Sequence, residues 1–324
     1  MYNAIKFVNT ASQSAVRLNN CYTEWFQVTT GVRQGDTLSP LLFSIFINDL
    51  AKGVKDLNCG VELSNDQQVS ILLYADDVVL LAADEQKLNT SLQFVHEWCQ
   101  KWRMVINEQK TEVIHFQKKG MQRTEAVFRY GNRSLNVTNK YRYLGLVLNE
   151  NMDMKLTANV LAEAGGRALG ALKSKLKPIK DCGYYSFMKL YNTGILPILN
   201  YGAGVWGYYY QEKHECIQRR ALHYFLGVHR FSPNHAIEGD MGVVSSVARH
   251  IEILRLWNRL VTMQDNRLTR KLFNYDFSIC KDNWSEELGK ILNVLGMDNY
   301  FISQSPVDIG TLKGMLQSIE FAKC

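Results

Sequence analysis

Two kinds of apolar spacing follow one another in the first half of the chain. Residues 69–83 hold two apolar runs on either side of the polar pair Asp76 and Asp77, which predicts a hairpin of mostly buried strands with an acidic tip. Residues 84–102 then place apolar side chains three and four positions apart on one face. We therefore expect a helix there, with Asp84 as its N-cap.

Three more elements are predicted around this hairpin and helix. Residues 41–50 show helical spacing. That helix should begin near Ser39 or Pro40, because serine favours the cap position and proline suits the first turn. Apolar residues 104–106 and 113–116 flank a polar turn, which predicts a second pair of strands.

Strand signals fade near residues 149–153, and helical patterns follow. Residues 141–148 predict one more strand or one arm of a hairpin, and residues 155–177 predict a helix that Pro178 ends. Residues 184–226 continue as an aromatic stretch of helical tendency. Further amphipathic helices are predicted at 242–263 and 284–295. The predicted fold class is therefore α+β for the first part, followed by a mainly helical part.

Composition and charge single out one region. The chain of 324 residues is 46% hydrophobic and has a formal charge of +6, which excludes a disordered or strongly acidic protein. Residues 165–231 hold ten Lys and Arg against three Asp and Glu, a larger excess than in the whole chain. Basic groups bind phosphate and aromatic rings stack on bases, which favours nucleic-acid contact. The alternative is a helical bundle with an aromatic core and a solvated basic face. The aromatic residues are Tyr184, Tyr185, Tyr191, Tyr201, Trp206, Tyr208, Tyr209 and Tyr210.

Targeting and cysteine patterns predict an intracellular protein, in the nucleus or the cytoplasm. The first residues lack a basic stretch followed by an apolar one, so no secretory signal is predicted. No apolar run is long enough to span a membrane. The seven cysteines are dispersed without a C-x-x-C pair, which fits neither a disulfide framework nor a zinc site. We therefore expect a protein of a reducing compartment that has no membrane partner.

The candidate chemistry lies at the acidic tip, Tyr74-Ala75-Asp76-Asp77. Adjacent carboxylates suit hard divalent cations, and two-metal phosphoryl transfer needs carboxylates that hold such ions. The alternative is that aspartate simply favours tight turns. A second candidate is the loop from Gly31 to Pro40, where a Gly-x-x-Gln-Gly pattern opens a helix and lets amides approach a ligand closely.

In combination, these motifs resemble those of the reverse transcriptases of non-LTR, LINE-like retrotransposons. The order and spacing agree over residues 20–150, and a later stretch resembles the thumb-side region of such polymerases. The similar segments are residues 31–43 for motif B, 74–77 for motif C, 98–111 for motif D, 141–145 for motif E and 190–207 for the thumb side.

The resemblance implies a role for each matching position. Asp76 and Asp77 would be catalytic acids that ligate Mg²⁺, with Mn²⁺ as an alternative. Lys110 would act as a general acid that protonates the leaving pyrophosphate, the alternative being a solvated turn lysine. The implied nucleotide and template contacts are Arg33, Gln34, Gly35, Tyr74 and Ala75. The implied primer grip is Tyr143, Leu144 and Gly145, the alternative being an ordinary buried strand.

The resemblance also implies the architecture and the partners. Residues 1–150 would form a partial right-hand palm of antiparallel strands and packed helices. Residues 151–232 would be a basic, helical, thumb-like region, and 233–324 a helical C-terminal region of unknown role. The partners of the intact family are an RNA template, a DNA primer and deoxynucleoside triphosphates.

Two parts of the family pattern have no counterpart here. Residues 1–35 contain no Asp and only one acid, Glu24, so the motif A carboxylate is absent, and Asp36 lies within motif B. The fingers region that precedes motif A is absent too. We therefore expect an N-terminally truncated RNA-directed DNA polymerase that is inactive as this chain alone. The alternatives are a non-catalytic, retroelement-derived nucleic-acid-binding protein and a remnant that acts through protein contacts.

Overall fold

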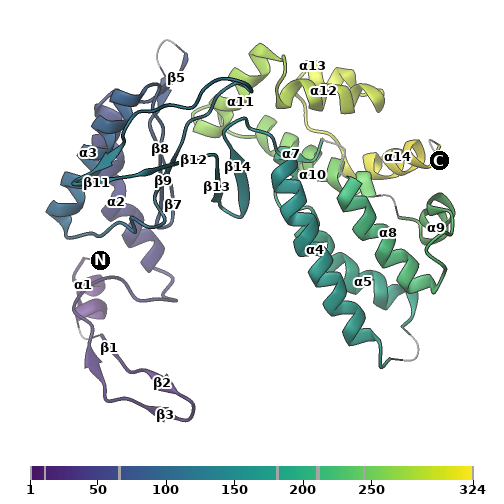
Figure 1. Cartoon of the computed structure of the whole chain (residues 1–324), viewed down its shortest axis with the longest axis horizontal. Coiled ribbons are helices and arrows are strands. Elements are labelled where there is room, and N and C mark those ends of the chain that lie inside the picture. Colours follow the sequence, from purple (N-terminus) through teal and green to yellow (C-terminus); the bar gives the residue numbers. More distant parts are fainter. Residues whose placement is uncertain are drawn as a thin grey trace. The chain divides into compact units, whose positions relative to one another are not determined.

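The chain divides into two compact units, which are described separately below (Figure 1). A computed structural model describes residues 2–10, 12–64, 67–179, 182–208, 212–243 and 245–322. The first unit comprises residues 1–111 and 125–136, and the second comprises residues 112–124 and 137–324. The change from strands to helices at residues 149–153 therefore lies within the second unit.

The first unit is built around one hairpin and two helices. Helix α2 (Ser39–Asp56) packs against strand β7 (Ile71–Tyr74), and α3 (Glu85–Trp102) packs against β8 (Asp77–Leu80) and against α2 (Figure 1). The hydrophobic effect holds these elements together, because apolar side chains from both helices leave water at their contact. The buried residues of α2 and α3 include Ile47, Leu50, Val54, Leu92, Val95, Trp98 and Cys99.

The other elements of the first unit are short. Helix α1 (Tyr2–Thr10) opens the chain. Each strand pair is antiparallel, and most are only two residues long. The pairs are β1 (Gln13–Ser14) with β4 (Phe26–Gln27), β2 (Arg17–Leu18) with β3 (Cys21–Tyr22), β5 (Val61–Ser64) with β6 (Gln67–Val69), and β10 (Arg129–Tyr130) with β11 (Arg133–Ser134).

The second unit begins with strands and continues as helices. Strand β9 (Glu112–Ile114) pairs with β12 (Asn136–Thr138), and β13 (Lys140–Tyr143) forms an antiparallel hairpin with β14 (Leu146–Asn149). The helices that follow are α4 (Lys155–Leu176), α5 (Tyr184–Gly194), α6 (Leu196–Leu199), α7 (Ala203–Trp206), α8 (Glu212–Leu226), α9 (Asn234–Met241), α10 (Ser245–Val261), α11 (Leu268–Ile279), α12 (Trp284–Val294), α13 (Asp298–Ile302) and α14 (Ile309–Ala322).

Among the residues that the structure describes, three apolar clusters lie in the core of these helices. One joins α10 to α11, α12 and α14 around Trp257, and another joins α4, α5 and α8 around Tyr191. The third packs the side chains of Leu146 and Leu148 from β14 against Trp206 of α7 and residues of α4. Both tryptophans are fully buried, and both donate their ring N–H to a backbone carbonyl, so neither polar atom is left unsatisfied.

Most of the predicted elements are present. The hairpin of residues 69–83 is β7–β8, and the Asp84 carboxylate caps α3 by accepting a hydrogen bond from the Lys87 amide at 2.8 Å. The helices predicted at 41–50, 155–177, 242–263 and 284–295 are confirmed as α2, α4, α10 and α12. The mixture of helices and small antiparallel sheets is an α+β fold. Among the described residues, no helix has the length and hydrophobicity needed to cross a membrane.

Four details differ from the sequence prediction. Residues 104–106 are not a strand, because Arg103 ends α3 with a φ of +54° and leads into exposed chain, with Val105 93% exposed. Ser39 is not the cap of α2. It is the first helical residue, and its hydroxyl donates to the Arg33 carbonyl at 2.6 Å. Residues 141–148 form both arms of a hairpin rather than one. The β7–β8 strands are only partly buried, with Ile71 alone below a tenth exposed.

Candidate functional site

The acidic tip is a two-residue turn that joins β7 to β8. Tyr74 and Asp77 are the last strand pair, so Ala75 and Asp76 occupy the turn. Ala75 has a φ of +52°, and Asp76 does not have a positive φ. A two-residue connection closes a tight hairpin, so both aspartates lie at its end.

The conformation of Ala75 is costly for a residue with a side chain. A left-handed backbone brings Cβ close to the following carbonyl and costs roughly 1–2 kcal/mol. Such a conformation persists only when its surroundings determine it, and the paired strands on both sides do so here. All four residues from Tyr74 to Asp77 are exposed, so both carboxylates are open to solvent.

The tip supplies two hard oxygen donors for a divalent cation. Asp76 and Asp77 are of the right chemical kind for Mg²⁺ or Mn²⁺, which prefer carboxylate oxygens. Within the described parts of the chain, no group of three or more His, Cys, Asp or Glu side chains is placed to hold a metal ion. The donor set therefore fits a divalent cation in kind, and further ligands would have to come from elsewhere.

The loop before α2 carries Arg33, Gln34 and Gly35, all three exposed. Gly35 has a φ of +83°, a conformation that glycine adopts without strain. The Arg33 guanidinium donates through Nε to the hydroxyl of Ser12 at 2.7 Å. The Asp36 carboxylate accepts from the Leu38 amide at 2.9 Å, so it closes the loop onto the start of the helix. These bonds hold the loop while the Gln34 side chain stays exposed to solvent.

Lys110 lies in the turn that follows α3. Its amide donates to the backbone carbonyl of Asn107 at 3.1 Å, and the Asn107 side chain lies 3.3 Å from the same amide. In the same turn, Glu108 forms an ion pair with Arg133 of β11 at 2.6 Å. The Lys110 side chain is exposed. The turn is thus well defined by backbone and side-chain bonds.

Residues 143–145 form the tip of the β13–β14 hairpin in the second unit. Leu144 and Gly145 have φ values of +47° and +84°, and positive values at both central positions are the pattern of a type I′ turn. Tyr201, in the bend between α6 and α7, donates its hydroxyl hydrogen to the Leu144 carbonyl at 2.9 Å. The sequence pattern gave no indication of this contact, because 57 residues separate the two partners.

The structure distributes the predicted site residues between the two units. The tip at Asp76 and Asp77, the loop at residues 33–35 and the turn at Lys110 all belong to the first unit. The hairpin tip at residues 143–145 belongs to the second.

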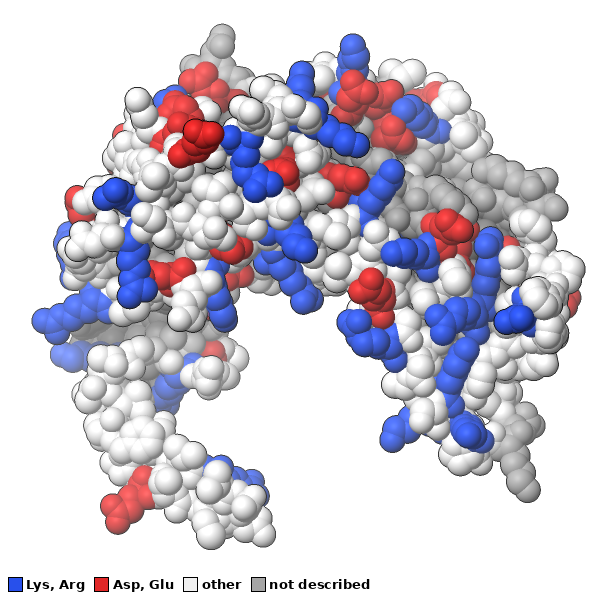
Figure 2. Space-filling view, viewed as in Figure 1, with Lys and Arg blue, Asp and Glu red and all other residues white. Residues whose placement is uncertain are grey.

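Basic side chains gather over α4, α5 and α8 of the second unit (Figure 2). Lys175, Lys177 and Arg220 are exposed there. Lys173 lies over the ring of Tyr224 at 4.9 Å and donates to the Arg220 carbonyl. Burial lowers the pKa of the Lys173 ammonium, and the neighbouring Arg220 lowers it further.

The aromatic residues of this region have two different environments. Tyr185 is 87% exposed, and Tyr184 and Tyr201 are about half exposed. Tyr191 and Trp206 are fully buried in the apolar clusters, so they serve the core and not a nucleic-acid surface. Burial raises the pKa of the Tyr191 hydroxyl, which stays protonated. Tyr208 packs partly buried against the α10 cluster, and Tyr209 and Tyr210 lie outside the described residues.

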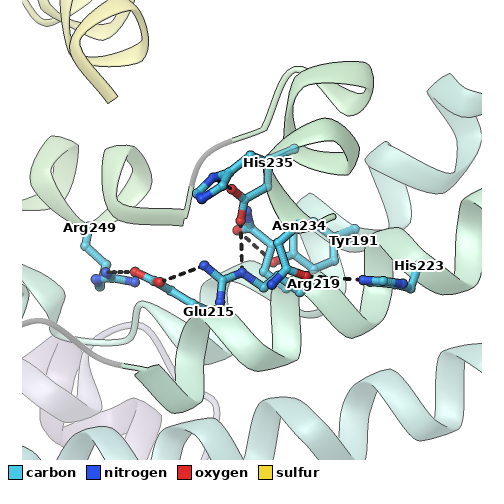
Figure 3. Close-up of polar contacts among 9 residues, drawn as sticks. Tyr191, Glu215, Arg219, His223, Asn234, His235 and Arg249 are labelled. Carbon is cyan, nitrogen blue, oxygen red and sulfur yellow. Dashed lines mark hydrogen bonds and ion pairs between the residues drawn. The ribbon is translucent and has the colours of Figure 1, made fainter. Parts of the chain in front are cut away.

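A buried ionic network joins α8, α9 and α10 (Figure 3). The Glu215 carboxylate lies between Arg249, at 3.3 Å, and Arg219, at 3.4 Å. Arg219 also pairs with Glu238 at 3.1 Å, and His235 lies 3.7 Å from Glu238. The Arg249 side chain is only 3% exposed. Because these charges are buried and paired across three helices, the network has a structural role.

His214 is a buried histidine of α8, the helix that also carries Glu215 and Arg219. Its Nε2 lies 3.0 Å from the Leu199 carbonyl, and its ring lies 5.2 Å from that of Trp206. Burial lowers the pKa of the imidazole to about 4, and the positive charge of Arg249 acts in the same direction. The imidazole is therefore neutral at physiological pH and donates to the carbonyl.

Part of the chain is similar in sequence to a known protein family. Residues 2–148 match the family model described as "Reverse transcriptase (RNA-dependent DNA polymerase)". A "Probable RNA-directed DNA polymerase from transposon BS" of Drosophila melanogaster is 24% identical over 298 residues, which cover 84% of this chain and 32% of that protein.

Two further relatives carry related names. An "RNA-directed DNA polymerase from mobile element jockey" of Drosophila funebris is 23% identical over 281 residues, covering 84% of this chain and 30% of that protein. A "Retrovirus-related Pol polyprotein from type-1 retrotransposable element R2" of Nasonia vitripennis is 27% identical over 171 residues, covering 50% of this chain and 16% of that protein. The chain thus spans about a third or less of the length of these relatives.

Proposed function

Because residues 2–148 are a reverse transcriptase segment of the non-LTR retrotransposon kind, we propose that the chain is part of an RNA-directed DNA polymerase. The observation that carries this proposal is the β7–β8 hairpin, which presents two exposed carboxylates at a regular two-residue tip. The substrates of such an enzyme are an RNA template, a DNA primer and deoxynucleoside triphosphates. The proposed architecture is a partial palm followed by a helical, thumb-like region.

Each exposed group has a chemical task in this proposal. Asp76 and Asp77 would hold a divalent cation, which neutralises charge on the transferred phosphoryl group when it is bound. The Lys110 ammonium, placed on a defined turn, would donate a proton to the leaving pyrophosphate. Gln34 and Gly35 would contact the base pair of template and incoming nucleotide, because the loop leaves them open to solvent. Residues 143–145 would contact the primer.

The proposal requires a carboxylate beyond this pair. Asp76 and Asp77 would hold such ions together with at least one further carboxylate, because hard divalent cations need more oxygen ligands than one pair of side chains supplies. Residues 1–35 offer no aspartate for it. We therefore propose that DNA synthesis needs an acidic residue from a polypeptide segment other than residues 1–324.

Primer extension by a graft tests the proposal. The part of this chain that aligns with the jockey polymerase would replace the corresponding part of that enzyme, and we expect the graft to synthesise DNA on an RNA template with Mg²⁺. Asp76→Asn in the graft should lower the rate by about a hundredfold or more, because charge stabilisation in the transition state is lost. Asp56→Asn, an exposed aspartate at the end of α2, is the control and should have no effect. A graft that folds and binds template–primer but does not synthesise DNA would contradict the proposal.

The chain alone gives a second arm of this test. We expect no template-dependent product with Mg²⁺ or Mn²⁺. Product that disappears in Asp76→Asn would contradict the need for a further carboxylate while supporting the role of the tip.

The basic surface over α4, α5 and α8 favours a second candidate function, nucleic-acid binding without catalysis. Lys175 and Arg220 lie on the neighbouring helices α4 and α8, Lys177 directly follows α4, and all three are exposed. Tyr185 adds an exposed ring of the kind that stacks on bases. This function would need no contribution from the acidic tip.

Salt dependence tests the second function. Lys175→Gln, Lys177→Gln and Arg220→Gln combined should reduce the slope of log affinity against log salt by about three, because each cation that contacts a phosphate releases about one counterion. Filter binding of a primer–template duplex between low and moderate salt measures that slope. The matched control is Arg255→Gln, Lys271→Gln and Lys290→Gln combined, which removes the same charge from α10, α11 and α12. Equal slopes for the two triple variants would exclude this surface as the binding site.

A further inference from the structure

The tip of the β13–β14 hairpin is held by one tyrosine from the helical part of the same unit. The Tyr201 hydroxyl donates to the Leu144 carbonyl at 2.9 Å. Its ring also covers Gly145 so closely that a Cβ at position 145 would lie 2.9 Å from the ring carbon Cε1. Tyr201 therefore contacts both central residues of the turn, one through a hydrogen bond and the other through its ring.

The position of Tyr201 is itself fixed by its neighbours. The Trp206 ring N–H donates to the Tyr201 carbonyl at 2.9 Å, and Trp206 is fully buried. Gly202, the next residue, has a φ of +67°, and a Cβ there would lie 3.1 Å from the side chain of Leu146. The two segments thus fit together closely, and a shift of Tyr201 would require a shift of the buried tryptophan.

The strands behind the tip are attached to the same helical part. The Thr157 hydroxyl of α4 donates to the Val147 carbonyl at 2.6 Å and accepts from the Val147 amide at 2.9 Å. Thr157 is 1% exposed, so both bonds are shielded from water. An isolated two-stranded hairpin is only marginally stable in water. The position of this hairpin is therefore set by its attachments, Thr157 at the strands and Tyr201 at the tip.

We propose that Tyr201 is a positioning residue for primer binding. This inference rests on the proposed function, in which residues 143–145 contact the primer. Leu144 has a left-handed backbone that is unfavourable for leucine, so a turn without its hydrogen bond to Tyr201 has other conformations available. By fixing the turn, Tyr201 fixes the place of the primer end before the primer binds. Small errors in the placement of reacting groups have large effects on rate, which gives this contact functional weight.

Hydrogen exchange of the peptide 140–149 tests the contact itself. Tyr201→Phe keeps the ring and removes the hydroxyl, and exchange at the hairpin tip should be about fivefold faster, as the loss of one hydrogen bond predicts. Gly145→Ala changes the other partner of the same contact. It should also make exchange faster, because the new Cβ would displace the Tyr201 ring. Tyr185→Phe is the matched control, since that tyrosine is 87% exposed. Unchanged exchange in both variants would overturn the contact.

A fluorescent base at the primer end tests the positioning role. The probe is an RNA template with a DNA primer that carries 2-aminopurine at its 3′ end or at an internal site. In Tyr201→Phe, the fluorescence change of the terminal 2-aminopurine at saturating protein should fall to about half of the wild-type value or less. The duplex affinity and the fluorescence change of the internal 2-aminopurine should stay within about twofold of the wild type. A loss of overall stability would move all three readings together.

The two experiments separate the possible failures. An unchanged terminal response in Tyr201→Phe, with normal duplex binding, would overturn the positioning role and leave the proposed function intact. A wild-type chain that binds no duplex would overturn the proposed function and the primer role with it. In that case faster exchange would still show that Tyr201 holds the turn.

Discussion

Glu215→Ala should lower the free energy of unfolding of the second unit by about 3–5 kcal/mol, because it removes one partner of a buried ion pair. Arg249 is almost fully buried and would lose the Glu215 carboxylate, while Arg219 would keep its bond to Glu238. The charge of Arg249 would then have to be accommodated in a region of low polarity. Urea denaturation followed by circular dichroism measures the change.

A surface pair provides the matched control for this prediction. Glu252 and Arg255 form an ion pair on α10 with both side chains more than a third exposed. Glu252→Ala should change the free energy of unfolding by about 1 kcal/mol or less, since solvent screens such pairs.

A double variant identifies the cause. Replacing the pair with apolar residues, Glu215→Leu with Arg249→Met, should recover most of the lost stability, because neither charge of the pair is then buried. A Glu215→Ala chain as stable as the wild type would show that water reaches Arg249.

Acidification should destabilise the second unit through His214. Its pKa is about 4 in the folded chain, whereas an ordinary histidine has a value of 6.5. The unfolded chain therefore binds a proton as the pH falls below 6.5, and the folded chain does not until about pH 4. Stability is unaffected by this group above pH 6.5 and falls by about 3 kcal/mol between pH 6.5 and 4.

The pH dependence of denaturation midpoints checks this prediction. His214→Gln should flatten the loss of stability between pH 6.5 and 4, whatever its effect at neutral pH. His229→Gln, at an exposed histidine, should leave the slope as it is in the wild type. Identical slopes in the wild type and His214→Gln would show that His214 is protonated in the folded chain.

Local patterns predicted the elements whose stabilising contacts are local. Asp84 caps α3 through the amide three residues later, and the β7–β8 hairpin closes over two residues. The prediction failed where the local structure is determined by a contact outside the local pattern or by the backbone conformation alone. Ser39 has the residue type of a cap, but it donates to the Arg33 carbonyl instead. The apolar run at 104–106 has strand composition, yet Val105 finds no partner surface and stays exposed.

The same distinction explains what could be predicted of the candidate site. Asp76 and Asp77 are adjacent in the sequence, so their joint position at one tip follows from the hairpin pattern. Tyr201 and Leu144 are far apart, as are Glu215 and Arg249, and no periodicity connects such partners. One signal was available for the ionic network: Glu215 and Arg219 are four residues apart, the spacing of neighbours on a helix. The roles of residues 33–35, 74–77, 110 and 143–145 stay predictions.

The division of the chain affects how its parts could be exchanged between genes. The polypeptide enters the second unit after residue 111, returns to the first after residue 124, and enters the second again after residue 136. No single junction therefore yields two complete pieces. A recombination point after residue 150 would give one product the β13–β14 hairpin and the other product both Thr157 and Tyr201. Inheritance as one uninterrupted block is the simplest way for such a polypeptide to keep its contacts.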